Sequence, residues 1–191
     1  MKARIAIFAS GAGTNAENLI SYFRTSDVAQ VDLVLTNKKE AGVLEKAKAL
    51  EVPTYVFSKQ DLNSSDAVLQ TLKDFNIDWI VLAGFLLKVP ESLIDAYPDR
   101  IINIHPALLP KYGGKGMYGQ HVHRAVLEAG ERETGISIHF VNEHYDQGAM
   151  IAQHKVNLGD EETAESIAAK VHALEYKWFP PIVEETISKN N

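Results

Sequence analysis

The chain has 191 residues, of which 46% are hydrophobic and 23% charged, and its formal net charge is −6. These values predict one globular domain with a sizeable core rather than a disordered chain, and the acidic charge argues against a general nucleic-acid-binding surface. The absence of cysteine excludes disulfides, a thiolate nucleophile and a cysteine zinc site. The N-terminal apolar run is too short for a signal peptide or a membrane span, so we expect a cytoplasmic protein that does not engage membranes.

Apolar runs and helical apolar stripes alternate along the first half of the chain. Residues 4–9 form an apolar run that ends in a glycine-rich turn, and a stripe with helical spacing follows. The alternation then continues, with strands expected at 31–35, 54–57, 79–83 and 101–104 and helices at 43–50 and 68–75. Strands and helices that alternate at short spacing predict βαβ units on a mostly parallel sheet.

The pattern changes after Pro110. Four glycines between residues 113 and 119 predict a mobile loop, which is followed by a helix at 122–128 and strands at 136–141 and 150–156. A long helix is expected from Thr163 to about Ile187. We expect Pro180-Pro181 to interrupt it, because proline lacks the N–H of a helical hydrogen bond.

The strand at 101–104 leads into the most informative pair of residues. Side chains alternate along a strand, so Asn103 and His105 share one face, about 7 Å apart. An amide donor beside an imidazole that can carry a proton suits a reaction that builds negative charge on an oxygen. Open sheets bind ligands at the carboxyl ends of their strands. We therefore expect this pair to meet the glycine-rich turn, Gly84 and the turn at 142–148 at one edge.

The turn Ser10-Gly11-Ala12-Gly13-Thr14-Asn15 joins the first strand to the first helix. Its glycines and the helix N-terminus could cradle a phosphate, or the segment could be only a tight turn capped by Thr14 or Asn15. The residues alone leave both interpretations open. The segment lacks the third glycine of a dinucleotide fingerprint and the Gly-Lys-Ser/Thr of a P-loop.

Other polar residues have ordinary alternatives. Asp146 lies in Tyr145-Asp146-Gln147-Gly148, where it is either a turn aspartate or a carboxylate that orients His105 and raises the pKa of that imidazole. From the residues alone, the remaining candidates are expected to be structural or solvated: His121 and His123 as solvated or loop residues, His139 as a packing position in a strand, and Glu175 on a solvated helix face.

Several motifs resemble those of one family. Asn103–Pro110 resembles the Asn-x-His-Pro-Ser-Leu-Leu-Pro signature of the folate-dependent formyltransferases, and residues 134–141 with Asp146-Gln147-Gly148 are similar to its second part. Within that family, members that act on a phosphorylated ribosyl substrate carry segments similar to residues 10–15, 36–38 and 82–85. The resemblance extends over nearly the whole chain, with the motifs in the same order.

The resemblance implies a Rossmann-like α/β fold with a mostly parallel central sheet and flanking helices. It implies a single domain over residues 1–191, whose N-terminal half binds the phosphate and ribonucleotide and whose C-terminal half binds folate and carries catalysis. The implied reaction moves the formyl group of 10-formyltetrahydrofolate, the co-substrate, to the amine of 5′-phosphoribosylglycinamide, the third step of purine synthesis. It also implies a metal-free enzyme that acts on small molecules as a monomer or homodimer.

Roles for individual residues follow from the resemblance. The amide of Asn103 and a protonated His105 would stabilise the oxyanion, and Asp146 would hold His105 and help move the amine proton. The phosphate and ribonucleotide would contact Gly13, Thr14, Asn15 and Glu175. The folate would be bound, largely through backbone groups, by Leu86, Leu87, Lys88, Val89, Asn103, Asn142, Glu143, His144, Tyr145 and Asp146.

The chain departs from the family pattern at a few positions. Ala107 replaces the usual serine, Gln147 replaces a common glycine, and the arginine that often follows Gly-Phe-x is replaced by Leu87. We expect Leu109-Pro110 to be a cis bond beside the site. Three alternatives stay open: a 10-formyltetrahydrofolate hydrolase, another folate-dependent formyltransferase, and a non-catalytic nucleotide-binding module. The added domains of the hydrolases and of the tRNA-dependent members are not expected here.

Overall fold

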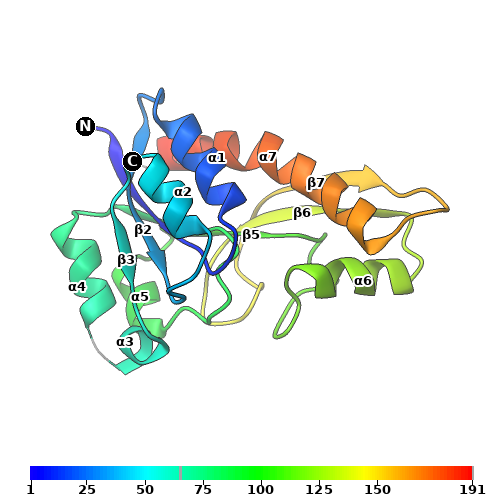
Figure 1. Cartoon of the computed structure of the whole chain (residues 1–191), viewed down its shortest axis with the longest axis horizontal. Coiled ribbons are helices and arrows are strands. Elements are labelled where there is room, and N and C mark those ends of the chain that lie inside the picture. Colours follow the sequence, from blue (N-terminus) through cyan, green and yellow to red (C-terminus); the bar gives the residue numbers. More distant parts are fainter. Residues whose placement is uncertain (65, 191) are drawn as a thin grey trace.

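The computed structural model describes residues 1–64 and 66–190, in which seven strands form one sheet of order β3-β2-β1-β4-β5-β6-β7 (Figure 1). The parallel strands are β1 (Ala3–Phe8), β2 (Ala29–Thr36), β3 (Thr54–Val56), β4 (Trp79–Leu82) and β5 (Ile101–His105). The other two are β6 (Glu133–Phe140), which runs antiparallel to both its neighbours, and β7 (Met150–Asn157). The expected α/β fold with a mostly parallel sheet is therefore confirmed.

Helices cover both faces of the sheet (Figure 1). One apolar layer includes residues of α1 (Thr14–Phe23), α2 (Val43–Ala49), α6 (Gln120–Glu128) and α7 (Ala164–Lys189). The opposite layer includes residues of α3 (Lys59–Ser64), α4 (Ala67–Asp74) and α5 (Glu91–Ala96). The sequence did not predict α3 and α5, because six residues are too few to show a helical apolar stripe. Of the helices in the described ranges, none has the length and hydropathy to cross a membrane.

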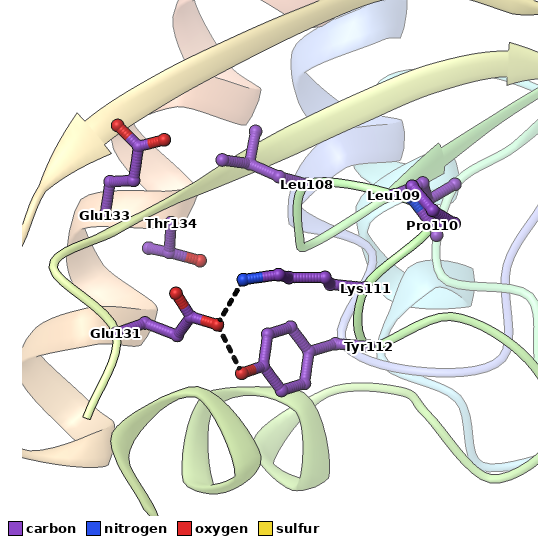
Figure 2. A pocket seen from close by; sticks show the side chains of 8 residues that line it. All are labelled: Leu108, Leu109, Pro110, Lys111, Tyr112, Glu131, Glu133 and Thr134. Carbon is purple, nitrogen blue, oxygen red and sulfur yellow. Dashed lines mark hydrogen bonds and ion pairs between the residues drawn. The ribbon is translucent and has the colours of Figure 1, made fainter. Parts of the chain in front are cut away.

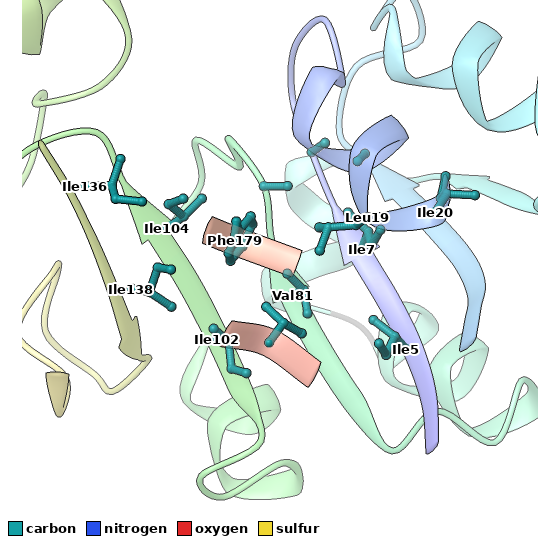
Figure 3. Packing of buried hydrophobic residues seen from close by; sticks show 14 of the residues in the cluster. Ile5, Ile7, Leu19, Ile20, Val81, Ile102, Ile104, Ile136, Ile138 and Phe179 are labelled. Carbon is teal, nitrogen blue, oxygen red and sulfur yellow. The ribbon is translucent and has the colours of Figure 1, made fainter. Parts of the chain in front are cut away.

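The core explains why the central strands are almost continuously apolar. All four residues of β4 are buried, as parallel strands covered on both faces require. On one face, isoleucines of β1, β5 and β6 pack beneath Leu19 of α1 and Phe179 of α7 (Figure 3). Burial of each such side chain stabilises the fold by roughly 1.5–3 kcal/mol, and this packing makes β5 a rigid support for the residues at its end.

Helix α7 is continuous from Ala164 to Lys189, so the expected interruption at Pro180-Pro181 is wrong. Pro180 has no N–H to donate to the carbonyl of Tyr176, four residues earlier. The side-chain amide of Asn18 on α1 donates to that carbonyl at 2.8 Å instead. A contact from another helix thus provides a hydrogen bond that the helix itself cannot make.

We expect Asn18→Ala to destabilise the fold by about 1 kcal/mol, because the Tyr176 carbonyl then loses its donor. In a Pro180→Ala background the same change should cost less, since the alanine introduced there has its own N–H to donate. Urea unfolding of the four proteins of this double-mutant cycle measures the difference. Equal costs in the two backgrounds would show that the Asn18 amide does not replace the missing helical bond.

Candidate active site

Strand β5 places Asn103 and His105 on one face, as the alternation of side chains predicts. The antiparallel pairing of β5 with β6 sets His139 opposite Asn103 and Ser137 opposite His105. His105 is only 4% exposed although it is the last residue of its strand. The site is therefore built on two paired strands of the sheet.

Asp146 completes the expected group of three. Its Oδ2 lies 3.7 Å from Nδ1 of His105, and its Oδ1 lies 3.5 Å from the Asn103 amide nitrogen and 3.7 Å from Nε2 of His139. The N–H of Gly114 donates to Oδ2 at 2.8 Å. Asp146 is thus both a turn residue, with φ of 54°, and a carboxylate that faces His105. The structure brings Asn103, His105 and Asp146 together.

The tautomer of His105 is fixed by a backbone carbonyl. Nε2 of His105 lies 2.7 Å from the carbonyl oxygen of Tyr112. A carbonyl only accepts, so Nε2 carries the hydrogen. Nδ1 of the neutral ring is then the nitrogen that faces Asp146, and its lone pair is available to take up a proton.

Burial lowers the pKa of His105, although Asp146 and the hydrogen bond to Tyr112 both act to raise it. The expected rise in pKa through Asp146 is therefore outweighed by the cost of charging a buried imidazole. A lowered pKa favours the neutral imidazole at pH 7 over the protonated form.

The pKa of Asp146 is lowered overall. Burial acts to raise it, but the nearby imidazoles of His139 and His105 and the N–H of Gly114 together outweigh that effect. Asp146 is accordingly an anion at neutral pH, placed to stabilise a positive charge on His105.

His139 is a site residue that the sequence did not predict. Its Nδ1–H donates to the carbonyl of Phe140 at 2.7 Å, so Nε2 can accept from the Asn103 amide at 3.1 Å. The expected packing role is thus incomplete: the ring is 2% exposed, as a packing position would be, but it also orients Asn103. One amide hydrogen of Asn103 goes to His139 and the other is only weakly engaged by Asp146. The signal in the sequence was a polar residue in an apolar strand, but its partner depended on the register with β5.

The glycine-rich turn lies at the carboxyl ends of three neighbouring parallel strands. The Ser10 hydroxyl donates to Asn37 at 2.6 Å and accepts from the N–H of Leu86 at 3.1 Å, which joins the loops after β1, β2 and β4. Gly13 precedes α1 with φ of 75°, and a Cβ there would lie 2.6 Å from Val43. The tight turn is thus confirmed, but its expected capping by Thr14 or Asn15 is wrong, because the N-cap is Gly13 and no side chain caps the helix.

That turn also borders a groove of about 640 Å³, lined by residues 10–12 and 38–42. Lys38, Lys39 and Glu40 line the groove, whereas Gly13, Thr14 and Asn15 do not, and α1 begins at Thr14, just after the lining residue Ala12. The two lysines and the helix N-terminus favour an anion and Glu40 disfavours one, so the phosphate interpretation stays open beside the structural one.

Asn15 and Glu175 are brought together from opposite ends of the sequence. Oε2 of Glu175 accepts from the Asn15 amide and from Nδ1–H of His172, both at 2.9 Å. Glu175 is 5% exposed, so the solvated helix-face position inferred from its residues alone is wrong. The hydrogen bond with Glu175 raises the pKa of His172.

The expectation for His121 and His123 is half wrong. Both lie on α6 rather than in a loop, and His121 is exposed. His123 is 4% exposed, and its Nδ1 has no hydrogen-bond partner among the residues that the structure describes. Burial lowers the pKa of His123, because α6 turns this ring toward the core.

The two segments expected to bind folate flank one apolar cluster. Leu87, Val89 and Val141 pack in the same layer, while Leu86 and Tyr145 are 38% and 39% exposed.

The glycine-rich turn, Gly84 and the end of β5 meet at one edge, as expected.

The turn at 142–148 does not start at that edge, because β6 is antiparallel. The N–H of Val141 bonds the carbonyl of Ile101 at the beginning of β5, and the chain then returns to place Asp146 at the site. The expected convergence is therefore corrected for this element. Leu109-Pro110 is cis, as expected.

Comparisons with known proteins agree on one family. The formyl transferase profile matches residues 3–183. Phosphoribosylglycinamide formyltransferase of Bacillus subtilis is 32% identical over 98% of this chain and 96% of its own. The chloroplastic protein of that name from Arabidopsis thaliana is 41% identical over 94% of this chain, which spans 64% of that relative's length. The crystal structure of the protein of that name from Bacillus halodurans superimposes with a TM-score of 0.87 and 36% identity, over 98% of this chain and 97% of its own.

We expect the fold to lose stability as the pH falls below about 6.5, the ordinary pKa of histidine. The pKa values of His105 and His123 are lowered by burial, so the unfolded chain binds protons first and acid favours unfolding. The stability they contribute is complete above about pH 6.5 and is lost toward their folded-state pKa values. His172 acts in the opposite sense, but its side chain is 62% exposed.

Urea unfolding between about pH 7.5 and pH 5.5 measures this slope. His123→Gln should make the slope shallower, because one buried imidazole no longer titrates. His121→Gln, which changes an exposed ring on the same helix, is the matched control. A slope in His123→Gln as steep as in the control would contradict the assignment.

Proposed function

The chain belongs to the formyl transferase family, and on that premise we propose that it transfers the formyl group of 10-formyltetrahydrofolate to the amine of 5′-phosphoribosylglycinamide. The products are formylglycinamide ribonucleotide and tetrahydrofolate, in the third step of purine (IMP) biosynthesis. The observation that carries the proposal is the arrangement of Asn103 and His105 on β5 with Asp146, which the turn after β6 brings to them. The relatives named for this activity support the choice of substrate.

Transfer begins when the amine attacks the formyl carbon. The carbonyl π pair moves to oxygen, and the attacking nitrogen becomes positively charged. The second amide hydrogen of Asn103 donates to the new oxyanion, while His139 holds the first. A preorganised donor of this kind typically contributes about 3–4 kcal/mol to transition-state stabilisation. The sheet holds this donor in place before the substrate arrives.

The proton of the attacking nitrogen passes to Nδ1 of neutral His105. The resulting imidazolium keeps its Nε2–H bond to Tyr112 and is stabilised by the carboxylate of Asp146. When the oxyanion collapses, the bond between the formyl carbon and the folate nitrogen breaks, and that nitrogen takes the proton from His105. The imidazole is then neutral again, so a lowered pKa suits a group that accepts and returns one proton.

The ribonucleotide lies between α1 and α7 in this proposal. Gly13, Thr14 and Asn15 hold the phosphate at the N-terminus of α1, and Glu175 meets the ribosyl-glycinamide end. The bond from Asn15 to Glu175 supports a shared subsite. The N-terminal half thus supplies most phosphate contacts and the C-terminal half the folate and catalytic groups, with Glu175 an exception because α7 brings it back.

The folate occupies the space between residues 86–89 and 142–146, bound largely by backbone groups. Apolar Leu87, Val89 and Val141 provide a wall for a flat ring. It is a co-substrate, and the formyl donor is already activated, so the proposed reaction requires no metal. Within the described ranges, no group of three or more His, Asp or Glu residues could hold a metal ion.

Hydrolysis of the same folate and transfer to another amine are the rival reactions. Water in place of the amine would give formate, but the anion-favouring groove and the bond from Asn15 to Glu175 provide a place for a phosphorylated acceptor. A non-catalytic nucleotide-binding module would not need Asn103, His105 and Asp146 held together. Neither the hydrolase nor the binding module accounts for both parts of the site.

The experiment mixes purified protein with 10-formyltetrahydrofolate, with and without glycinamide ribonucleotide, and follows loss of the formyl-folate. We expect turnover that requires the ribonucleotide and falls about 10²–10³-fold in Asn103→Ala, as for loss of one oxyanion donor. Asn63→Ala, at an exposed site on α3, is the control. Turnover without the ribonucleotide would identify a hydrolase. No turnover under either condition, by a protein that unfolds cooperatively, would refute the proposed function.

A further inference from the structure

Residues 111–114 contact both titratable groups of the site. The carbonyl of Tyr112 accepts from Nε2–H of His105, and the N–H of Gly114 donates to Asp146. A movement of this segment would therefore affect the tautomer of His105 and the stabilisation of the charge on Asp146. The segment is a loop between β5 and α6, and regular secondary structure does not hold it in place.

The backbone of this segment is not in a relaxed conformation. Tyr112 has φ of 57°, in the left-handed region that bulky residues disfavour. A residue keeps such a conformation when its surroundings impose it. The orientation of the Tyr112 carbonyl thus depends on contacts made by its side chain and its neighbours.

Glu131 makes these contacts from the turn that follows α6. Its Oε1 accepts from the hydroxyl of Tyr112 and from Nζ of Lys111, both at 2.8 Å, and Figure 2 shows the two side chains converging on it. The N–H of Glu131 bonds the carbonyl of Val126 in α6. A charged acceptor forms stronger hydrogen bonds than a neutral one, and this acceptor is itself attached to a helix.

A neighbouring carboxylate provides a contrast. Glu131 and Glu133 both line a cavity of about 260 Å³ beside residues 108–112 (Figure 2). Glu133 bonds Lys155 of β7 at 2.9 Å instead of the segment. Two glutamates in the same cavity wall thus have different partners: Glu131 bonds residues 111 and 112, whereas Glu133 bonds a strand.

We infer that Glu131 is a positioning residue for His105, which acts through Tyr112 by holding its carbonyl against Nε2. The hydrogen bond from the Tyr112 hydroxyl to Glu131 holds the segment, rather than the ion pair of Glu131 with Lys111. The Lys111 side chain is 67% exposed, and exposed ion pairs contribute little. The kinetic consequence rests on the proposed function, whereas the tautomer of His105 can be observed without any substrate.

The first test is the ring tautomer, read by NMR of ¹⁵N-histidine-labelled protein above about pH 7.5, where an ordinary imidazole is neutral. We expect one Nε2–H tautomer of His105 in the wild type and a mixture in Glu131→Ala and Tyr112→Phe. Glu131→Gln, which keeps an acceptor oxygen, should restore much of the wild-type spectrum. Glu133→Gln is the matched control and should leave the spectrum unchanged.

The second test is turnover with both substrates. Glu131→Ala and Tyr112→Phe should lower kcat about tenfold with little change in KM, because misplacement of a catalytic group affects the chemical step. Wild-type spectra and kcat in both variants would overturn the inference. If Glu131→Ala does not fold, Tyr112→Phe still decides, since it removes one hydroxyl. If the variants change the tautomer of His105 but the wild-type protein shows no turnover, the positioning role is upheld and the proposed reaction is refuted.

Discussion

The hydrogen bond from Nε2 of His105 to the carbonyl of Tyr112 is the interaction on which the site depends. It assigns the hydrogen of a buried ring, and it thereby turns Nδ1 toward Asp146. Without it, a neutral imidazole would divide between two tautomers, and only one of them presents a lone pair to the reacting amine. The accepting carbonyl belongs to the loop after β5, at a residue whose backbone is left-handed.

The fold supplies the rest of the site through one change of strand direction. Five parallel strands give the edge where the Ser10 hydroxyl joins three loops. The antiparallel β6 then sets His139 opposite Asn103, where its ring directs the amide. An all-parallel continuation would have required a crossover connection. The orientation of the Asn103 amide therefore depends on the strand that breaks the parallel pattern.

Local rules predicted the parts of this structure that depend on neighbours in sequence. Alternation along a strand placed Asn103 and His105 together, and short strand–helix spacing gave the parallel sheet. The role of His139 required the register of two strands, and the burial of Glu175 required a contact with Asn15, 160 residues away. At Pro180, the continuous helix α7 receives a hydrogen bond from the Asn18 amide of α1, which the sequence of α7 alone does not show. The pKa of His105 was the hardest to anticipate, because burial and the field of Asp146 oppose each other.

The electrostatics of the site suit His105 to accept a proton and return it. Burial lowers the pKa of His105, and the anionic Asp146 favours the charged form of that ring. The most direct measurement follows a ¹³C label in the formyl group of 10-formyltetrahydrofolate by NMR, in the presence of glycinamide ribonucleotide. Our account predicts that the label appears as the formamide carbon of formylglycinamide ribonucleotide. Label that appears as formate while the ribonucleotide stays unchanged would contradict it.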